Sequence, residues 1–432
     1  MFIVSNLGPC KYDSPMKGST TFVSDDDRIL YNPDLNAFKN AVEHGMTNPV
    51  SIELAGAREK IFFEPSKTRA AIVTCGGLCP GLNNVVRALY FALLYRYGVK
   101  DVWGIQYGFS GFVKKYGFEP VKLTQEIVDE IHLAAGSFLG SSRGKQDTKE
   151  VVDFVEENKI NLLFCVGGDG TLRGAWEIAT EAMANRGYPL SVIGIPKTID
   201  NDISYISKSF GFDTAVHSAT HAIESAHAEA KGYYNGVGLV KIMGRQSGFI
   251  AAYTALACND VNFVLVPESN FDIKGNKGFL SALFERLNRR HHAVVLVAEG
   301  AGQQYFEKEK LGTDASGNAK QGDIGLLLKQ EILAYAKENH LECEVKYIDP
   351  SYMIRSTLAV SSDAIYCIQL AQNAVHAAMC GKTSIVIGNL QEHFTHVPIE
   401  TAISKRKTID IASTLWTSVL EATGQPVSMR NQ

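Results

Sequence analysis

The chain has 432 residues, 45% of them hydrophobic, and its 42 basic and 46 acidic side chains nearly cancel. This length is enough for two buried cores, and the charge balance excludes the cationic footprint of a nucleic-acid-binding protein. No apolar stretch approaches the roughly 20 residues that cross a bilayer, so we expect no membrane partner and a cytoplasmic location. Eight scattered cysteines favour reduced thiols over a disulfide framework.

Residues 1–67 are polar and irregular, with several prolines and a run of three aspartates, and we interpret them as an N-terminal extension. Strands and helices are then expected to alternate, with strands at 70–74 and 102–105 and helices at 82–97 and 125–133. This alternation predicts a parallel sheet, because parallel strands are joined through crossover helices.

Two polar loops accompany these first elements. The sequence Thr-Cys-Gly-Gly-Leu-Cys-Pro-Gly-Leu-Asn at 74–83 ends the first strand and opens a helix, a position suited to a phosphate or a ribose. Glycine-rich turns of this kind also occur for tight packing alone. The second loop is Ser-Ser-Arg-Gly at 141–144, whose arginine could fork onto a phosphate.

The strongest signal lies in the next two strand-to-loop junctions. An apolar strand at 162–166 leads into Gly-Gly-Asp-Gly-Thr at 167–171 and a helix at 172–181, and a strand at 190–195 leads into Pro-Lys-Thr-Ile-Asp-Asn-Asp at 196–202. Parallel strands end at one edge of a sheet, where such folds bind ligands. The N–H groups at the helix start can cradle phosphate. Together the two loops predict phosphoryl transfer.

The second half repeats the pattern, with strands expected at 238–243, 262–266 and 293–298. Their ends carry Met-Gly-Arg-Gln-Ser-Gly at 243–248 and Ala-Glu-Gly at 298–300, and Asp-Pro-Ser-Tyr-Met-Ile-Arg follows at 349–355. The arginines and the glutamate could bind a sugar phosphate, although each could also lie on a solvated face. Residues 303–323 have no apolar periodicity and are interpreted as an exposed, inserted loop.

Several other enzyme classes have no support in the sequence. There is no Gly-x-x-x-x-Gly-Lys-[Ser/Thr] loop, and the glycine spacing at 168–174 misses the dinucleotide fingerprint by one residue. Walker-type ATPases and Rossmann dehydrogenases are therefore disfavoured. The absence of Gly-x-Ser-x-Gly also leaves acyl hydrolysis without support.

With these motifs in this order, the chain resembles the 6-phosphofructokinases over residues 68–400, in particular the ATP-using branch close in sequence to pyrophosphate-using enzymes. The resemblance implies an α/β fold of two doubly wound Rossmann-like domains with the active site between them, plus the N-terminal extension at 1–67. Residues 68–211 with 354–407 would form a nucleotide-binding domain. Residues 212–353 with 408–432 would form a sugar-phosphate-binding domain.

The resemblance also assigns roles to individual residues. The residues that it places at ATP are Gly77, Arg143, Gly144, Gly168, Asp169, Gly170, Thr171 and Gly174. The residues that it places at fructose 6-phosphate are Thr198, Ile199, Asp200, Met243, Gly244, Arg245, Glu299, Lys346, Tyr352 and Arg355, some of which could act across a subunit interface. Asp200 would be the catalytic base, and Asp169 and Asp202 would hold Mg²⁺.

The phosphoryl donor depends on two residues that conflict. Lys197 is typical of pyrophosphate-using relatives, whereas Gly170 is typical of ATP users, because pyrophosphate users carry an aspartate there that would occupy the space of the ATP α-phosphate. We expect ATP to be the donor, since the resembled branch combines both residues. Phe109 stands where the family often has a tyrosine.

The expected function is therefore that of an ATP-dependent, glycolytic 6-phosphofructokinase. Two alternatives stay open, a pyrophosphate-dependent phosphofructokinase and a catalytically silent sugar-phosphate sensor. An NAD kinase would share the loop at 167–171 but would not explain the motifs at 243–248 and 352–355. The family also implies allosteric regulation and a homo-oligomer, either a homotetramer or a dimer.

Overall fold

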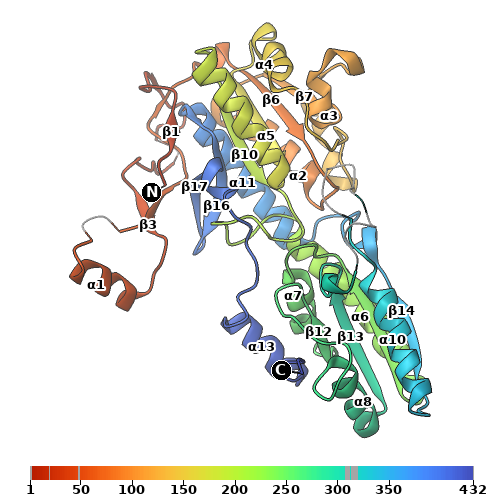
Figure 1. Cartoon of the computed structure of the whole chain (residues 1–432). Coiled ribbons are helices and arrows are strands. Elements are labelled where there is room, and N and C mark those ends of the chain that lie inside the picture. The colour runs from red at the N-terminus through yellow and green to blue at the C-terminus, as the bar shows by residue number, and fades with distance from the viewer. Residues whose placement is uncertain (1, 19, 47–48, 307–311, 313–319, 432) are drawn as a thin grey trace. The chain divides into compact units, whose positions relative to one another are not determined.

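The computed structural model describes residues 2–18, 20–46, 49–306, 312 and 320–431. The chain forms two compact units, which are shown in Figure 1. Unit 1 comprises Met1–Thr198, Ile203–Gly211 and Leu358–Arg406, and unit 2 comprises Ile199–Asp202, Phe212–Thr357 and Lys407–Gln432. Among the described residues, no helix is both long enough and apolar enough to span a membrane.

In the described part of unit 1, nine strands form one sheet. In spatial order they are β3 (Arg28–Leu30), β4 (Ser51–Leu54), β17 (His393–Pro398), β16 (Ile385–Leu390), β10 (Ser191–Pro196), β9 (Leu162–Gly167), β6 (Arg69–Thr74), β7 (Asp101–Ile105) and β8 (Val121–Lys122). The five strands from β16 to β7 are parallel, and the outer ones are antiparallel. Every residue of β9 and β10 is buried, as in parallel sheets covered on both faces.

Helices cover both faces of this sheet. α4 (Thr148–Glu157), α5 (Asp169–Thr180) and α12 (Ile399–Ala402) pack together on one face, and α2 (Leu82–Ala92) and α11 (Ser361–Met379) pack together on the other (Figure 1). The α/β fold with a parallel sheet is thus confirmed. The expected helix at 125–133 is broken into α3 (Gln125–Val128) and the 3-10 turn η5 (Ile131–Leu133).

The remaining short elements of unit 1 connect these strands and helices. They are η1 (Pro65–Lys67), the π-helical turn η2 (Leu93–Tyr97) that extends α2, η3 (Gly108–Phe112), η4 (Lys114–Tyr116) and the π-helical turn η6 (Glu181–Asn185) that extends α5. Helix α5 begins at Asp169, three residues before the start expected from apolar periodicity. The acidic residue of the glycine loop is therefore in the first turn of the helix.

Unit 2 is built on a second parallel sheet, with the order β12 (Phe263–Leu265), β13 (His292–Ala298), β11 (Gly236–Ile242) and β14 (Glu344–Ile348) in its described residues. The first three strands match the expected ones, and β14 was not predicted. Helices α6 (Phe212–Lys231), α7 (Phe249–Cys258) and α13 (Thr414–Thr423) pack together, whereas α8 (Phe279–Arg290) and α10 (Ile324–Glu338) share another core. Two further short turns are η7 (Gln303–Tyr305) and η8 (Ser351–Ile354).

Two expectations about irregular segments have different outcomes. The loop expected at 303–323 falls largely outside the described residues. The interpretation of residues 1–67 as irregular is wrong, because β4 pairs with β17 and β3 pairs with β4, which adds two strands to the sheet of unit 1. The segment also contains β1 (Ser5–Asn6), paired with β15 (Lys382–Thr383), and β2 (Tyr12–Asp13), paired with β5 (Lys60–Ile61).

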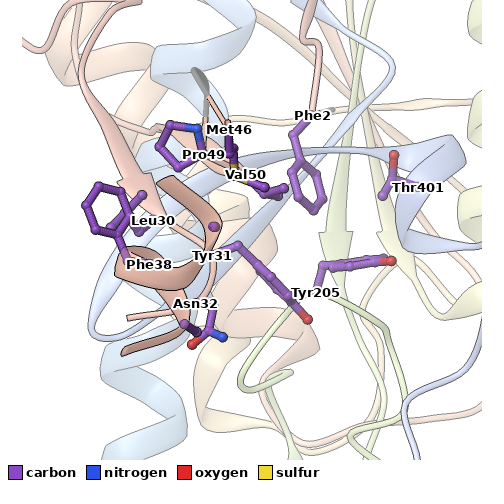
Figure 2. A pocket seen from close by; sticks show the side chains of 12 residues that line it. Phe2, Leu30, Tyr31, Asn32, Phe38, Met46, Pro49, Val50, Tyr205 and Thr401 are labelled. Atoms are coloured by element: carbon purple, nitrogen blue, oxygen red, sulfur yellow. The ribbon is translucent and has the colours of Figure 1, made fainter. Parts of the chain in front are cut away.

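The helix of this extension, α1 (Leu35–Glu43), begins where the Asp34 carboxylate accepts a hydrogen bond from the Ala37 N–H. It lines a cavity of about 530 Å³ (Figure 2). The aromatic rings of Phe2, Tyr31 and Tyr205 meet in the wall of this cavity. Helix α1 itself has no buried residue.

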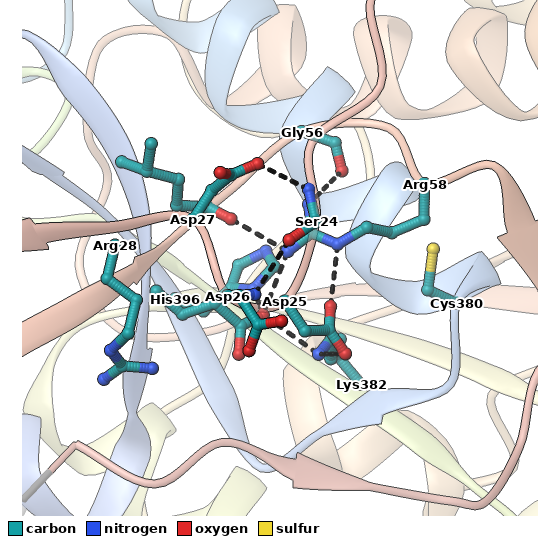
Figure 3. A network of polar contacts seen from close by, with 12 residues as sticks. Ser24, Asp25, Asp26, Asp27, Arg28, Gly56, Arg58, Cys380, Lys382 and His396 are labelled. Atoms are coloured by element: carbon teal, nitrogen blue, oxygen red, sulfur yellow. Dashed lines mark hydrogen bonds and ion pairs between the residues drawn. The ribbon is translucent and has the colours of Figure 1, made fainter.

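An ionic network that is buried except at Asp25 fixes the extension to the sheet (Figure 3). Glu53 Oε1 accepts hydrogen bonds from Arg58 Nη2 at 3.0 Å and His396 Nδ1 at 2.9 Å, and pairs with Lys382 Nζ at 2.9 Å. Asp25 pairs with Arg58 and with Lys382, both at 2.8 Å. Two carboxylates and two permanent cations cancel, so neutral His396 donates its Nδ1–H to Glu53.

Candidate active site

In unit 1, loops from three parts of the sequence meet at the carboxyl ends of β6 and β9. Gly76 has φ +87°, a conformation that favours glycine, and its N–H donates to Ser142 O at 2.9 Å. Ser141 Oγ donates to Gly76 O at 2.6 Å. The loop that carries Arg143 and Gly144 is therefore fixed against the turn that carries Gly77.

The start of α5 lies beside these loops and has the groups that an anion site requires. Gly168 caps the helix, and the first intrahelical bond runs from Leu172 N–H to Gly168 O at 3.0 Å. The N–H groups of Asp169, Gly170 and Thr171 thus precede the hydrogen-bonded ladder and point out of the helix start. Such N–H groups and the helix dipole favour a bound phosphate.

The glycines of this motif serve different purposes. A Cβ on Gly170 would meet no atom within 4 Å, so its exposed face is open. A Cβ on Gly174 would lie 2.7 Å from Cε2 of Phe109, whose ring is buried against this glycine. Gly174 therefore makes room for the Phe109 ring, which holds the loop of η3 against α5.

Asp169 is already paired with cations of its own unit. Its Oδ2 lies 3.0 Å from Arg173 Nε and 3.8 Å from Arg406 Nη2. Arg173 also donates to Ile403 O at 2.8 Å, which fixes the guanidinium beside the helix start. The Asp169 side chain stays 21% exposed, so its carboxylate can still meet a ligand.

Lys197 lies in the core of these loops rather than in solvent. Its side chain is buried, and its Nζ donates to Gly77 O at 2.6 Å. Ser209 Oγ donates to Thr198 O at 2.7 Å. Lys197 therefore joins the loop after β10 to the loop after β6, and Thr198 is the last residue of unit 1 before the chain enters unit 2.

In unit 2, a second group of loops surrounds the ends of β11 and β13. Gly244 has φ +135°, and its O accepts from the Gly300 N–H at 3.1 Å. The Glu299 N–H donates to Ile242 O at 2.8 Å. These bonds place Met243, Gly244 and Arg245 beside Glu299, as their shared position at strand ends predicts.

Burial and charge set the electrostatics of this second group. Burial raises the pKa of the Glu299 carboxyl, and nearby Lys241 and Arg245 oppose that shift. Burial alone would lower the pKa of Lys241, but its ion pairs with Asp323 and Asp349, both at 2.9 Å, raise it. Lys241 therefore stays charged and helps to keep a carboxylate at Glu299.

Two further groups of unit 2 were expected at the substrate. Arg355 lies with its Cζ 4.7 Å from the centroid of the Tyr352 ring, which is 63% exposed. Stacking of this kind limits the positions that the guanidinium can take. The segment Ile199–Asp202, with the expected base, also belongs to unit 2, where Ser247 Oγ donates to Asp200 O at 3.0 Å.

Comparison with known proteins decides the family. A family model described as "Phosphofructokinase" matches residues 69–378. The chain belongs to the phosphofructokinase family. A relative from Borreliella burgdorferi, named ATP-dependent 6-phosphofructokinase, is 45% identical over 100% of this chain and 98% of its own. Relatives of the same name from Amycolatopsis methanolica and Trypanosoma brucei brucei are 43% and 44% identical, over 97% of this chain and 94% and 86% of theirs.

Solved structures of phosphofructokinases share the fold. The pyrophosphate-dependent phosphofructokinase of Marinobacter aquaeolei matches 83% of this chain and 92% of its own with a TM-score of 0.67 and 19% identity. The Pichia pastoris phosphofructokinase in the T-state matches 82% of this chain and 37% of its own, with a TM-score of 0.65 and 21% identity. The predicted family and the predicted two-domain Rossmann-like α/β fold are both confirmed.

One expected substrate residue of this phosphofructokinase lies apart from the others within its unit. Lys346 pairs with Glu344 at 3.1 Å, and its Nζ lies 4.0 Å from the centroid of the Tyr233 ring. Glu344 is the first residue of β14, and Tyr233 precedes β11. The ammonium therefore points toward the amino ends of the strands, whereas Arg245, Glu299 and Arg355 lie near the carboxyl ends.

The structure also adds residues that the sequence did not single out. Arg173 could have been found, because it follows Asp169 at the helical i, i+4 spacing. Nothing local marks Lys241 or Lys407, whose partners come from distant parts of the chain. Among the described residues, no group of three or more His, Cys, Asp or Glu side chains is placed to hold a metal ion.

Proposed function

We infer that this chain is an ATP-dependent 6-phosphofructokinase, which transfers the γ-phosphoryl group of ATP to the 1-hydroxyl of fructose 6-phosphate. The observation that carries this inference is 45% identity over the full chain to a relative named for that activity. This is the function predicted from the sequence. The loops of the two units supply the groups that each substrate requires.

We propose that ATP binds to unit 1. Its phosphates would accept hydrogen bonds from the N–H groups at the start of α5, at Gly168, Asp169, Gly170 and Thr171. Arg143, which is exposed on the loop fixed to Gly76, would add a cation that forks onto phosphate oxygens. Arg173 would hold the Asp169 carboxylate in place. Gly77 and Gly144 would let the backbone approach the nucleotide.

Fructose 6-phosphate would bind to the loops of unit 2. Arg245 and Arg355 would contact its phosphate or hydroxyl oxygens, and the Glu299 carboxylate would accept hydrogen bonds from sugar hydroxyls. Met243, Gly244 and Tyr352 would line the same group of loops, with Thr198 and Ile199 leading into the base. Asp200 would take the proton of the 1-hydroxyl as that oxygen attacks the γ-phosphorus and the bond to ADP breaks.

We propose that Asp169 holds Mg²⁺ and that Asp202 supports the ion or its water shell. Asp169 fits this role, because Mg²⁺ in phosphoryl-transfer sites is bound by one or two carboxylates together with phosphate and water oxygens. Asp169 offers one partly exposed carboxylate at the phosphate-binding helix start. Bound there, the ion would neutralise charge on the transferring phosphoryl group.

The position of Lys346 supports an oligomer. Its ammonium is directed toward Glu344 and Tyr233 rather than toward Arg245 and Arg355. If Lys346 binds the substrate phosphate, it does so in a neighbouring subunit, and we propose a homodimer or homotetramer on this ground. Lys346→Ala should then raise the KM for fructose 6-phosphate while the native mass stays that of the oligomer.

Because Lys197 is typical of pyrophosphate-using relatives, a pyrophosphate-dependent phosphofructokinase is the second candidate. The Lys197 ammonium binds the main chain at Gly77 O, which is compatible with either donor. The deciding experiment measures initial rates with fructose 6-phosphate and Mg²⁺, with ATP or pyrophosphate as donor, and couples fructose 1,6-bisphosphate formation to NADH oxidation. Turnover with ATP alone is expected. Turnover with pyrophosphate alone would establish the second candidate, and none with either would favour a silent sensor.

A further inference from the structure

The segment that carries Asp200 is a short stretch of unit 2 inserted between two segments of unit 1. The four residues Ile199–Asp202 belong to unit 2, whereas the residues on both sides, up to Thr198 and from Ile203, belong to unit 1. A segment this short has no hydrogen-bonded ladder of its own and must be held by bonds to its surroundings. The conformation of Asp200 therefore depends on what holds these four residues in unit 2.

Lys407 makes two bonds to this segment. Its main-chain N–H donates to Asp202 O at 2.9 Å, and its Nζ donates to Asn201 Oδ1 at 3.0 Å. Asn201, which accepts one of these two bonds, has φ +52°. This left-handed conformation is uncommon for a residue with a side chain and persists where the surroundings fix it. Lys407 thus holds Asn201 and Asp202, the two residues that directly follow Asp200.

Lys407 is itself held in place. Its Nζ lies 5.2 Å from the centroid of the Phe249 ring, which limits the freedom of the side chain. Two residues later, the Ile409 N–H donates to Glu268 Oε1 at 2.9 Å. The same Glu268 carboxylate accepts from the Gly248 N–H at 3.0 and 3.1 Å.

Glu268 therefore connects two anchors of the catalytic segment. Gly248 directly follows Ser247, which is buried and donates through Oγ to Asp200 O at 3.0 Å. The other anchor is Lys407, two residues before Ile409. The Glu268 carboxylate thus fixes the main chain next to both anchors, Ser247 and Lys407. Ser247 binds the main chain of the segment at Asp200, and Lys407 binds it at Asp202.

We propose that Lys407 is a positioning residue for phosphoryl transfer, which holds Asn201 and Asp202 so that the Asp200 carboxylate is aimed at the acceptor hydroxyl. The proposal rests on the assignment of Asp200 as the base. Displacing a catalytic group by about 1 Å can cost on the order of 100-fold in rate. Because Arg245, Glu299 and Arg355 are held by other contacts, loss of Lys407 should affect kcat far more than substrate binding.

The test compares Lys407→Met with Lys405→Met, a matched control that removes an exposed lysine two residues away whose Nζ lies over the Tyr205 ring. We expect Lys407→Met to lower kcat by about 10- to 100-fold, with both KM values within about 3-fold of wild type. Lys407→Arg should recover part of the loss, because a guanidinium can still donate to the Asn201 amide oxygen. The control should keep wild-type kinetics.

A second variant keeps the proposal testable if Lys407→Met does not fold. Asn201→Gly removes the amide that Lys407 binds while it tolerates the left-handed backbone. It should lower kcat by a similar factor, and the double variant should lose little more, because both changes break one interaction. A wild-type kcat in a folded Lys407→Met or Asn201→Gly variant would overturn the proposal, as would a raised KM with unchanged kcat.

Asp200→Ser, measured in parallel, tests the assignment of Asp200 as the base separately from the positioning role of Lys407. Loss of kcat by at least about 100-fold is expected for removal of a general base. Near-normal turnover in this variant would overturn the assignment of Asp200 and, with it, the role of Lys407. Loss of kcat in Asp200→Ser with wild-type kinetics in Lys407→Met would reject the positioning role alone.

Discussion

At the scale of single residues, we propose that Gly170 decides the phosphoryl donor. It lies exposed in the first turn of α5, and no atom of the chain lies within 4 Å of the place where its Cβ would be. The fold therefore does not require glycine here for packing. A glycine that packing does not explain leaves space for a ligand, and this space adjoins the N–H groups proposed to bind phosphate.

We predict that Gly170→Asp weakens use of ATP without weakening the fold. A carboxylate beside bound phosphates adds like-charge repulsion, and a rise of at least about 10-fold in the KM for ATP corresponds to about 1.4 kcal/mol. Steady-state kinetics and the melting temperature would be measured together. Gly170→Ala, which adds bulk but no charge, is the control. Unchanged ATP kinetics in Gly170→Asp would contradict the argument from steric and charge exclusion.

Gly174 shows why the role of every residue in the candidate site could not be predicted from the sequence. In the sequence, both glycines belong to one motif and both were assigned to the nucleotide. In the structure, a Cβ at Gly174 would collide with the Phe109 ring, a residue 65 positions earlier in the numbering, so packing alone explains this glycine. The motif predicted a loop and a helix start with free main-chain N–H groups, but the partner of each residue depends on contacts between distant segments.

At the scale of elements, periodicity predicted most of the parallel strands, but it missed the parallel strands β16 and β14 and the antiparallel strands of the unit 1 sheet. β6, β9, β10, β11 and β13 are buried apolar runs, which a sequence displays directly. β4 contains Ile52 and Glu53, both buried, in an otherwise polar segment. The cations that neutralise Glu53 are Arg58 and Lys382, and neutral His396 adds a hydrogen bond. Because these partners lie far from Glu53 in the sequence or outside its strand, the charge of Glu53 suggested an exposed position.

We predict that Lys382→Met destabilises unit 1 by about 3–5 kcal/mol, the cost of removing one partner of a buried ion pair. The Lys382 side chain is 2% exposed. Its loss leaves the two carboxylates of Glu53 and Asp25 with Arg58 as their one permanently charged partner in the network. Chemical denaturation would measure the effect. The control Lys60→Met breaks an exposed pair with Asp13 and should cost at most about 1 kcal/mol. Equal effects of the two substitutions would show that the network does not stabilise the extension.

We expect a buried histidine of α11, packed against η2, to make the protein sensitive to acid. His376 of α11 has its Nδ1 2.9 Å from Tyr97 Oη, and burial lowers the pKa of this histidine to about 4, with Arg96 and Arg58 acting in the same direction. Above pH 6.5 the imidazole is neutral in the folded and unfolded chains. As the pH falls from 6.5 to 4, only the unfolded chain takes up the proton, so folding stability is lost.

The expected loss from His376 is on the order of 3 kcal/mol over this range. We predict that the melting temperature falls between pH 6.5 and 4 and that His376→Gln makes the fall shallower, although it also lowers stability at pH 7. Thermal unfolding at a series of pH values measures both. His393→Gln, at an exposed histidine of β17, should leave the slope unchanged. A slope that is the same in His376→Gln and wild type would contradict this assignment.

At the scale of the whole molecule, each unit has its own sheet with parallel strands, its own core and its own group of polar loops at strand ends. The two sets of loops differ in chemistry. Those of unit 1 offer main-chain N–H groups at the start of α5 together with Asp169 and Arg143, whereas those of unit 2 offer the side chains of Arg245, Arg355, Glu299 and Asp200. This difference supports the proposal that one unit binds the nucleotide and the other binds the sugar phosphate.

We predict that each substrate slows hydrogen exchange mainly in one unit. A non-hydrolysable ATP analogue with Mg²⁺ should protect residues 75–81, 141–144 and 168–172, because the phosphates accept hydrogen bonds from N–H groups at the start of α5. Fructose 6-phosphate should protect residues 199–202, 243–248 and 299–301. Exchange measured by mass spectrometry on the intact protein, with β13 as an internal reference, distinguishes these patterns. Protection of the same loops by both ligands would reject the division of the substrates between the units.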